Sequence, residues 1–301
     1  SVFETTHAGI HSELRVYVDA RAAVKFSALT LANRSGRPRR LSVTGYVEWV
    51  LGDLREKTAM HVVTEIDKAT GTLCARNAFN TDMAGRTAFF DADAEEATRT
   101  VSGDRAEFLG RNGSAESPAA LARPQLSNRV GAALDPCAAI QVAFELGDGR
   151  EREIVFRLGV AGVRSAAEAG EVAKRLRGRD VAREALENAR DYWRHTLGAV
   201  QVETGDVATD VMANGWLLYQ ALACRLWART GLYQYGGAFG FRDQPVYTVA
   251  QPDGTVSWIT PVMASSPSAL RRVASPKISR HGSRISAMPS HQAITSGAGK
   301  P

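Results

Sequence analysis

In this chain of 301 residues, the stretch whose residue types are best suited to binding a ligand runs from 232 to 244. It reads Leu-Tyr-Gln-Tyr-Gly-Gly-Ala-Phe-Gly-Phe-Arg-Asp-Gln. Its glycines permit close or left-handed backbone turns. Its aromatic side chains can stack on the apolar face of a pyranose ring, while Arg242 and Asp243 supply donors and acceptors for vicinal hydroxyl groups. From the residue types alone, a sugar pocket and a helix-ending turn whose aromatic side chains simply pack are equally good interpretations. The residues that would contact a sugar are Tyr233, Tyr235, Phe239, Phe241, Arg242, Asp243 and Gln244.

A second group of polar side chains lies in a Gly- and Pro-rich excursion between residues 103 and 136. A connection of this length is usually functional or disordered, and the apolar Phe108, Leu109 and Leu121 within it predict that it packs. The polar group either reaches over a substrate site and helps to shape it, or forms an ionic network that holds the excursion to its own domain. Its members are Asp104, Arg105, Glu107, Arg111 and Asn112.

Other kinds of chemistry lack a motif. The histidines do not have the spacing of a zinc site, which needs three or four ligands, so no metal is predicted. No GxSxG nucleophile, GxGxxG turn or phosphate-binding P-loop occurs, and we expect neither a nucleotide nor another cofactor. The cysteines Cys74, Cys137 and Cys224 are far apart and odd in number, which favours reduced thiols in the cytoplasm.

The net charge of +5 comes from the C-terminal part of the chain. Residues 245–301 hold six basic side chains and one acidic side chain, whereas residues 1–244 hold 31 of each sign. A neutral body has no overall field that would steer it onto phosphates, so no nucleic-acid partner is expected. No run approaches the roughly 20 apolar residues that a membrane-spanning helix needs.

Short β-prone runs separated by turn residues fill the first half of the chain, as in an antiparallel β-sandwich. The run 14–18 alternates in polarity, and the longer runs 24–31 and 41–50 flank a polar turn that contains Gly and Pro. We expect these two longer runs to be antiparallel neighbours. The predicted sandwich domain spans residues 1–164.

Two helical segments follow the predicted sandwich. At Ser165 the apolar period becomes that of a helix, and Ser165 with Glu168 forms a capping-box pattern, so residues 165–200 are predicted to be a helical linker. A helix over 206–229 is apolar nearly all round and must therefore be buried by several neighbours. This helix and the aromatic stretch after it make up a third predicted domain, 201–244.

The composition changes abruptly after Gln244. Residues 245–301 contain seven of the eleven prolines and ten serines. Such a segment cannot bury enough apolar area to offset its ordering entropy, and we predict a disordered tail. It is either a natural linker or interaction tail, or the product of a shifted reading frame.

Several stretches resemble glycoside hydrolase family 94, formerly glycosyltransferase family 36, and within it the C-terminal module of the cyclic β-1,2-glucan synthases. The resemblance covers residues 1–244 and implies an incomplete galactose-mutarotase-like supersandwich, a helical linker and the first helix or helices of an (α/α)6 barrel. The stretches are residues 39–52, 75–77, 103–113, 134–138 and 232–244, with Asn214, Trp216, Leu217, Tyr219 and Gln220 on the helix before the last.

What the family implies is inverting phosphorolysis or transglycosylation of β-glucosidic bonds, in which a carboxylic acid protonates the leaving oxygen and inorganic phosphate attacks as co-substrate. By resemblance, Arg242 and Asp243 grip the glucosyl unit. After Gln244 the family continues as Leu-Gln-Asp, but Pro245 follows here. The family's catalytic acid lies beyond that point, so no residue inherits its role, and the abrupt departure favours a shifted reading frame for 245–301.

The sequence thus predicts a truncated, inactive piece of a carbohydrate-active glycosyltransferase or phosphorylase. Its partners would be a β-glucan oligosaccharide and the remainder of the parent synthase. The alternative is a non-catalytic β-sandwich module for carbohydrate binding or for oligomerisation, as in a homodimer formed through the sandwich. The piece itself is expected in the cytoplasm and its parent at the inner membrane.

Overall fold

The computed structural model describes residues 1–81, 83–93, 98–222, 247–250 and 256–259. The chain divides into two compact units, Ser1–Gly205 and Asp206–Pro301, and each is described by itself. None of the described helices is both long enough and apolar enough to cross a membrane.

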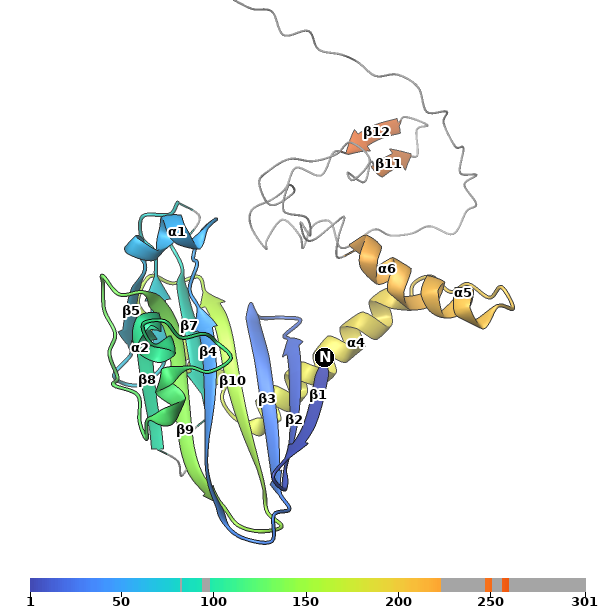
Figure 1. The fold of residues 1–301 in the computed structure, drawn as a ribbon. Coiled ribbons are helices and arrows are strands. Elements are labelled where there is room, and N and C mark those ends of the chain that lie inside the picture. The colour runs from blue at the N-terminus through green and yellow to red at the C-terminus, as the bar shows by residue number, and fades with distance from the viewer. Residues whose placement is uncertain (82, 94–97, 223–246, 251–255, 260–301) are drawn as a thin grey trace, which may run out of the picture. The chain divides into compact units, whose positions relative to one another are not determined.

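The first unit contains a β-sandwich of two antiparallel sheets, which confirms the predicted fold class (Figure 1). The larger sheet has seven strands in the order β1-β2-β3-β10-β7-β6-β5, and the smaller has three in the order β4-β9-β8. In that order, the strands of the larger sheet are Val2–His7, Ile10–Val18, Val24–Asn33, Glu151–Ala161, Thr87–Ala92, Leu73–Arg76 and Val63–Ile66. Those of the smaller sheet are Arg39–Glu48, Pro136–Leu146 and Thr98–Asp104.

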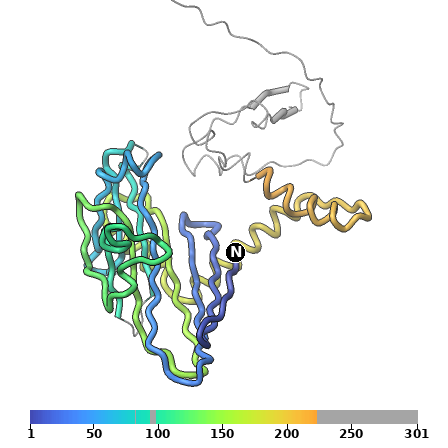
Figure 2. Tube along the Cα trace, in the orientation of Figure 1, coloured from blue at the N-terminus to red at the C-terminus, as the bar shows by residue number. Residues whose placement is uncertain are grey.

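The long strands β3 and β4 are not neighbours, so the expectation that they pair was wrong. β3 pairs with β2 and β10, whereas β4 pairs with β9. The β3–β4 turn and the β9–β10 turn each cross from one sheet to the other, and they lie side by side at one end of the sandwich (Figure 2). The buried Asn33 amide joins the two turns by donating to the carbonyl oxygens of Arg37 at 2.8 Å and Leu146 at 2.9 Å. Alternating polarity predicts a strand but does not reveal which sheet it joins.

The main apolar core lies between the two sheets and is built from alternate residues of their strands. Ile140 and Val142 of β9 and Ile154 of β10 are almost completely buried there. The Phe90 and Phe156 rings stack with centroids 5.8 Å apart. A Cβ on Gly45 would come within 2.6 Å of the Phe156 ring, so the absence of a side chain on β4 lets the two sheets approach at this point.

Two helices cover the outer face of the larger sheet, in the segment predicted to be helical. They are α3 (Ala166–Arg175) and α4 (Arg179–Leu197). The predicted cap at Ser165 is confirmed, because its Oγ accepts from the Glu168 backbone N–H at 3.2 Å and donates to Glu168 Oε1 at 3.0 Å. The buried surface between helices and sheet is made of Ala169, Ala173, Ala182 and Ala185 against Phe26, Phe89 and Val155.

A group of buried charges, here called the Asp91 network, fixes the α3–α4 junction to the larger sheet. Asp91 Oδ1 accepts from Arg99 Nη1 at 3.0 Å and from Arg177 Nη2 at 2.8 Å, and Arg157 Nη1 lies 3.7 Å from Asp91 Oδ2. Arg157 also pairs with Asp93, and its Nε donates to the Leu176 carbonyl oxygen at 2.6 Å. The side chains of Asp91 and Arg157 have no exposed area, at 0% each.

Charge pairing decides the ionisation of Asp91. Burial alone would raise the pKa of this carboxyl group, but the hydrogen bond from Arg177 and the charges of Arg99, Arg177 and Arg157 hold its pKa below the usual range. Asp91 is therefore an ionised group inside the fold, and its energetic role depends on keeping all three arginines in place.

Short helical segments decorate the ends of the sandwich. They are α1 (Arg55–Thr58), a 3₁₀ turn (Ala59–His61), α2 (Arg105–Leu109) and a second 3₁₀ turn (Ala119–Ala122). The first two lie between β4 and β5, and the other two belong to the excursion between β8 and β9.

The second unit begins with a helical segment at the predicted position. It consists of α5 (Val207–Val211), a π-helical stretch (Met212–Trp216) and α6 (Leu217–Gln220). Asp206 caps it by accepting from the Thr209 backbone N–H at 3.1 Å. Val207 and Val211 are 76% and 67% exposed, so this apolar helix has little cover from the described part of its unit.

The predicted tail over 245–301 falls almost entirely outside the described residues. The exceptions are the strands β11 (Tyr247–Ala250) and β12 (Val256–Ile259), which pair antiparallel with each other. These eight residues are extended and paired, unlike the structureless segment that the composition predicted.

Candidate functional site

The residues predicted to contact a sugar lie outside the described residues, so their role stays a prediction. The helix that precedes them is described, and in it the rings of Trp216 and Tyr219 stack with centroids 6.0 Å apart. The residues concerned are Tyr233, Tyr235, Phe239, Phe241, Arg242, Asp243 and Gln244.

The excursion between β8 and β9 packs, as its apolar residues predicted. Phe108 and Leu109 of α2 form a small core with Ala120, Leu126 and Ala139, and the Tyr46 ring stacks on Phe108 with centroids 4.5 Å apart. Leu121 is the exception among the apolar residues of the prediction, since it is 53% exposed. The excursion is thus anchored on the outer face of the smaller sheet.

Two of the acidic residues proposed for a site, Glu107 and Asp104, accept hydrogen bonds from residues in or next to the excursion. Glu107 Oε2 accepts from the Ser102 hydroxyl at 2.7 Å and the Ser127 hydroxyl at 2.6 Å. Burial would raise the pKa of Glu107, but these hydrogen bonds and the Arg123 charge keep its pKa below the usual value. Asp104 caps α2 by accepting from the Ala106 N–H at 3.0 Å.

Arg105 belongs to a closed ring of two arginines and two carboxylates. Its Nε lies 2.8 Å from Glu48 Oε1 and its Nη1 lies 3.4 Å from Asp135 Oδ2, while Arg55 pairs with the same two carboxylates. Tyr46 donates to Glu48 Oε1 at 2.8 Å. Partial burial would raise the pKa of Glu48, but the hydrogen bonds from Arg105 and Tyr46 hold its pKa below the usual value. Each charge in the ring is compensated by a neighbour.

These contacts favour the ionic-network interpretation for Asp104, Arg105 and Glu107, whose polar atoms are engaged in holding the excursion. Arg111 and Asn112 lie in the exposed turn after α2. The structure therefore does not gather the five residues into one recess.

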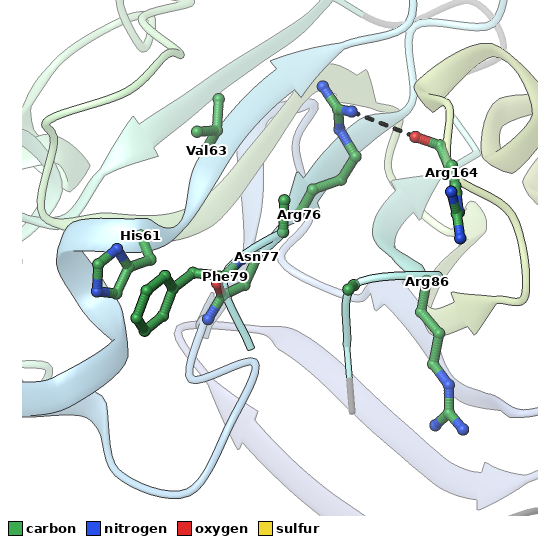
Figure 3. A pocket seen from close by; sticks show the side chains of 9 residues that line it. His61, Val63, Arg76, Asn77, Phe79, Arg86 and Arg164 are labelled. Carbon is green, nitrogen blue, oxygen red and sulfur yellow. Dashed lines mark hydrogen bonds between the residues drawn. The ribbon is translucent and has the colours of Figure 1, made fainter. Parts of the chain in front are cut away.

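A cavity of about 630 Å³ opens elsewhere on the first unit, near α1 and the start of α3 (Figure 3). A volume of this size is typical of a small-molecule site. Sequence reasoning did not single it out. The residues that line it are His61, Val63, Arg76, Asn77, Ala78, Phe79, Ala84, Arg86 and Arg164.

A turn fixed by Asn77 presents an aromatic ring at the cavity. The Asn77 side chain, only 1% exposed, donates to the Leu51 carbonyl oxygen at 3.0 Å and accepts from the backbone N–H groups of Phe79 at 3.1 Å and Asn80 at 3.2 Å. Phe79 stacks on His61 with centroids 4.2 Å apart and planes 15° apart, and it is still 76% exposed. One face of the Phe79 ring is supported and the other is open.

The rest of the cavity wall is basic. Arg76 at the end of β6 lies 2.8 Å from Glu65 Oε1 through its Nε, and its Nη1 donates to the Arg164 carbonyl oxygen at 3.2 Å. Arg86 precedes β7 and Arg164 precedes α3, and both lie across the cavity from the His61–Phe79 pair (Figure 3). The described residues of the lining include no acidic side chain.

The described cysteines are buried thiols. Cys74 and Cys137 are free, as expected, and Cys224 lies outside the described residues. Burial raises the pKa of Cys74 to about 12 and also raises that of Cys137, so neither is a nucleophile at neutral pH.

Comparison with known proteins decides the family. The model of the glycosyl hydrolase 94 supersandwich domain matches residues 1–179, and the model of the glycosyl hydrolase 94 catalytic domain matches residues 192–274. The chain belongs to glycosyl hydrolase family 94. This confirms the resemblance found in the sequence, and with it the supersandwich fold.

Relatives within family 94 differ in how similar they are to this chain. Cyclic beta-(1,2)-glucan synthase NdvB of Rhizobium meliloti (strain 1021) is 41% identical over 251 residues, which is 83% of this chain and 9% of that protein. N,N'-diacetylchitobiose phosphorylase of Vibrio furnissii is 26% identical over 266 residues, covering 84% of this chain and 32% of that protein. The chain thus spans a third or less of the length of these two relatives.

Among solved structures, a putative kojibiose phosphorylase from the human microbiome is 7% identical, with a TM-score of 0.42, covering 73% of this chain and 26% of that one. A similarity this low adds no argument to the family assignment. The family 94 catalytic-domain match continues past Gln244 to residue 274, although the sequence analysis expected the resemblance to end at Gln244. The shifted reading frame stays a prediction.

Proposed function

We propose that this chain is part of a carbohydrate-active protein that handles β-1,2-linked glucan, to which it contributes the supersandwich and the beginning of the catalytic domain. The observation that carries the proposal is its 41% identity, over 83% of the chain, to a protein named cyclic beta-(1,2)-glucan synthase. Identity to a diacetylchitobiose phosphorylase of the same family is 26%. This difference supports the glucan-synthase branch over the phosphorylases.

In this proposal the segment 233–244 holds a glucosyl unit. The aromatic rings stack on the sugar, Arg242 donates to one hydroxyl group, and Asp243 accepts from a neighbouring one. Gln244 adds a further donor and acceptor. The segment lies within the part of the chain that matches the catalytic domain of the family.

The proposal assigns binding but not turnover to the chain. A general acid in an inverting reaction must carry a proton near neutral pH, which requires a raised carboxyl pKa. In the described part of the chain, the carboxyl groups with clearly displaced pKa values are all displaced downward: Glu48, Asp53, Asp67, Asp91, Glu107 and Asp206. No cofactor enters the proposal, and inorganic phosphate would serve only a catalytic domain that has its acid.

Calorimetric titration of the 301-residue chain with β-1,2-linked gluco-oligosaccharides tests the proposal. We expect binding that is weaker with β-1,4-linked oligosaccharides of equal length and about tenfold weaker in Arg242→Gln and Asp243→Asn. Arg150→Gln, which changes an exposed arginine in the β9–β10 turn, is the matched control and should bind as the wild type does. Absence of binding, or equal binding by Arg242→Gln, would contradict the proposal.

Turnover is measured on the same samples by following glucose 1-phosphate after inorganic phosphate is added. We expect none. Formation of glucose 1-phosphate by the chain alone would show that it carries a working acid and would contradict the binding-only role.

A second candidate function is a carbohydrate-binding or oligomerisation module, favoured by two features of the sandwich. The cavity beside Phe79 is formed entirely by the first unit, so it does not depend on the catalytic domain. Strand β1 is exposed at all six residues along the edge of the larger sheet, which is a surface on which two copies could pair. Sedimentation of the chain as a monomer at all concentrations would leave carbohydrate binding as the only form of this candidate.

A further inference from the structure

We propose that the cavity lined by Phe79, Arg76, Arg86 and Arg164 binds a saccharide that carries a phosphate or carboxylate group. This site lies in the supersandwich, and none of its lining residues belongs to the segment 233–244. It would give the protein a second carbohydrate site with a different chemical preference.

The first argument is the prepared aromatic surface. Phe79 is exposed, its backbone N–H is held by the Asn77 side chain, and His61 stacks on one face of its ring. Its open face borders a cavity large enough for one or two sugar rings. The ring therefore offers a stacking surface whose ordering cost is already met by the fold.

The second argument is the unbalanced charge. Arg76 pairs with one carboxylate, that of Glu65. Among the described residues no carboxylate lies within 4.0 Å of the guanidinium groups of Arg86 and Arg164, two residues that line the cavity from separate segments. A planar guanidinium group donates two parallel hydrogen bonds to a phosphate or carboxylate, so the complementary ligand is an anion.

The two features together select the ligand class. A neutral glucan would leave the arginines without a partner of opposite charge, and a bare inorganic anion would leave the aromatic surface unused. A sugar with an anionic substituent satisfies both. A nucleic acid fits less well, because residues 1–244 are neutral overall and have no net field that would attract phosphates.

The test uses the 301-residue chain and four probes: glucose 6-phosphate, glucuronate, glucose and inorganic phosphate. We expect the two anionic sugars to bind about tenfold more tightly than glucose, and glucose 6-phosphate to bind more tightly than inorganic phosphate. Raising the ionic strength should weaken binding of the anionic sugars and leave glucose unaffected.

Variants identify the site. The double variant Arg86→Gln, Arg164→Gln should lose the preference for anionic sugars, and Phe79→Ala should bring glucose 6-phosphate down to the affinity of inorganic phosphate. Arg150→Gln is the control for charge, and circular dichroism shows that each variant is folded. Because none of the lining residues belongs to the segment 233–244, the double variant Arg86→Gln, Arg164→Gln should still bind β-1,2-linked gluco-oligosaccharides as the wild type does, which separates this proposal from the proposed function.

Three results would overturn the inference. They are no binding of either anionic sugar by the wild type, equal affinities for glucose and glucose 6-phosphate, and an unchanged preference in the folded double variant. Binding of inorganic phosphate as tight as that of glucose 6-phosphate would also count against a saccharide site and would indicate a simple anion site.

Discussion

Two groups of three arginines in the supersandwich differ in how far their charges are paired with carboxylates. In the Asp91 network, Arg99, Arg157 and Arg177 converge on one buried carboxylate, with Asp93 as a second acceptor. In the cavity beside Phe79, the described lining residues include three arginines and no carboxylate, and Glu65, which is not part of the lining, pairs with Arg76. The same side chain therefore holds the fold where its charge is matched, and is free to meet a ligand where it is not.

Burial explains why the two groups differ. Arg157 has no exposed side-chain area, so without its acidic partners its charge would be buried and uncompensated. Arg164 is exposed and Arg86 is half-buried, so water stabilises their charges until a ligand replaces it. The first group is expected to govern stability and the second to govern binding.

Removing the central carboxylate should give the largest effect. Asp91→Ala leaves three arginines around a buried site without their shared anion, and we expect a loss of about 3–5 kcal/mol in the free energy of unfolding. Urea unfolding followed by circular dichroism measures it. Asp180→Asn is the control, since its side chain is 98% exposed, and a loss below about 1 kcal/mol in Asp91→Ala would show that the network is dispensable.

Loss of the Asn77 side chain should come next. Asn77→Ala removes one donated and two accepted hydrogen bonds around a buried turn, and we expect a loss of about 1–3 kcal/mol together with weaker binding of glucose 6-phosphate. Asn80→Ala, on the same turn, is a useful comparison. Unchanged ligand affinity in a destabilised Asn77→Ala variant would mean that the turn does not position Phe79 for binding.

Lowering the pH should remove the stabilising contribution of the Asp91 network. The pKa of Asp91 is lower in the folded chain than in the unfolded one, so its contribution is fully present above the unfolded value of about 4 and is lost as the pH falls through the lower folded value. Urea midpoints measured downward from neutral pH should therefore fall most steeply below about pH 4. In Asp91→Asn this part of the decline should be smaller. Identical pH profiles for the two proteins would contradict a depressed Asp91 pKa.

Substitution of the cavity arginines should have the smallest effect on stability. Arg86→Gln and Arg164→Gln remove charges that water already solvates, and we expect unfolding free energies within about 0.5 kcal/mol of the wild type. Arg157→Gln provides the contrast, because it removes a buried member of the matched group. A large loss of stability in Arg86→Gln would show that the Arg86 side chain stabilises the folded chain.

The sequence predicted those parts of the fold that local patterns determine. The cap at Ser165 follows from a capping box, and packing of the excursion follows from Phe108 and Leu109, both buried. The assignment of β3 and β4 to one sheet failed because both strands alternate in polarity and the turn at Asn33 can either reverse the chain within a sheet or cross to the other. At this crossing the Asn33 amide contacts the β9–β10 turn, more than a hundred residues away in sequence, and such a contact cannot be read from the local pattern.

The same difference between local and long-range features applies to the candidate sites. The segment 233–244 attracted attention because its residues are contiguous, whereas the cavity is assembled from residues between His61 and Arg164 that are ordinary when taken singly. The only local signal was Arg76 with Asn77, which the sequence offered as a family resemblance without a role. Likewise, nothing in the strand pattern around Arg157 indicates that this arginine is buried.

The most direct test of the contrast is an NMR titration of the isotope-labelled chain with glucose 6-phosphate, observing the Nε–Hε signals of the arginine side chains. The account predicts progressive shifts for Arg76, Arg86 and Arg164, and none for Arg99, Arg157 and Arg177. Shifts spread equally over both groups, or no shift in the cavity group at saturating ligand, would contradict it.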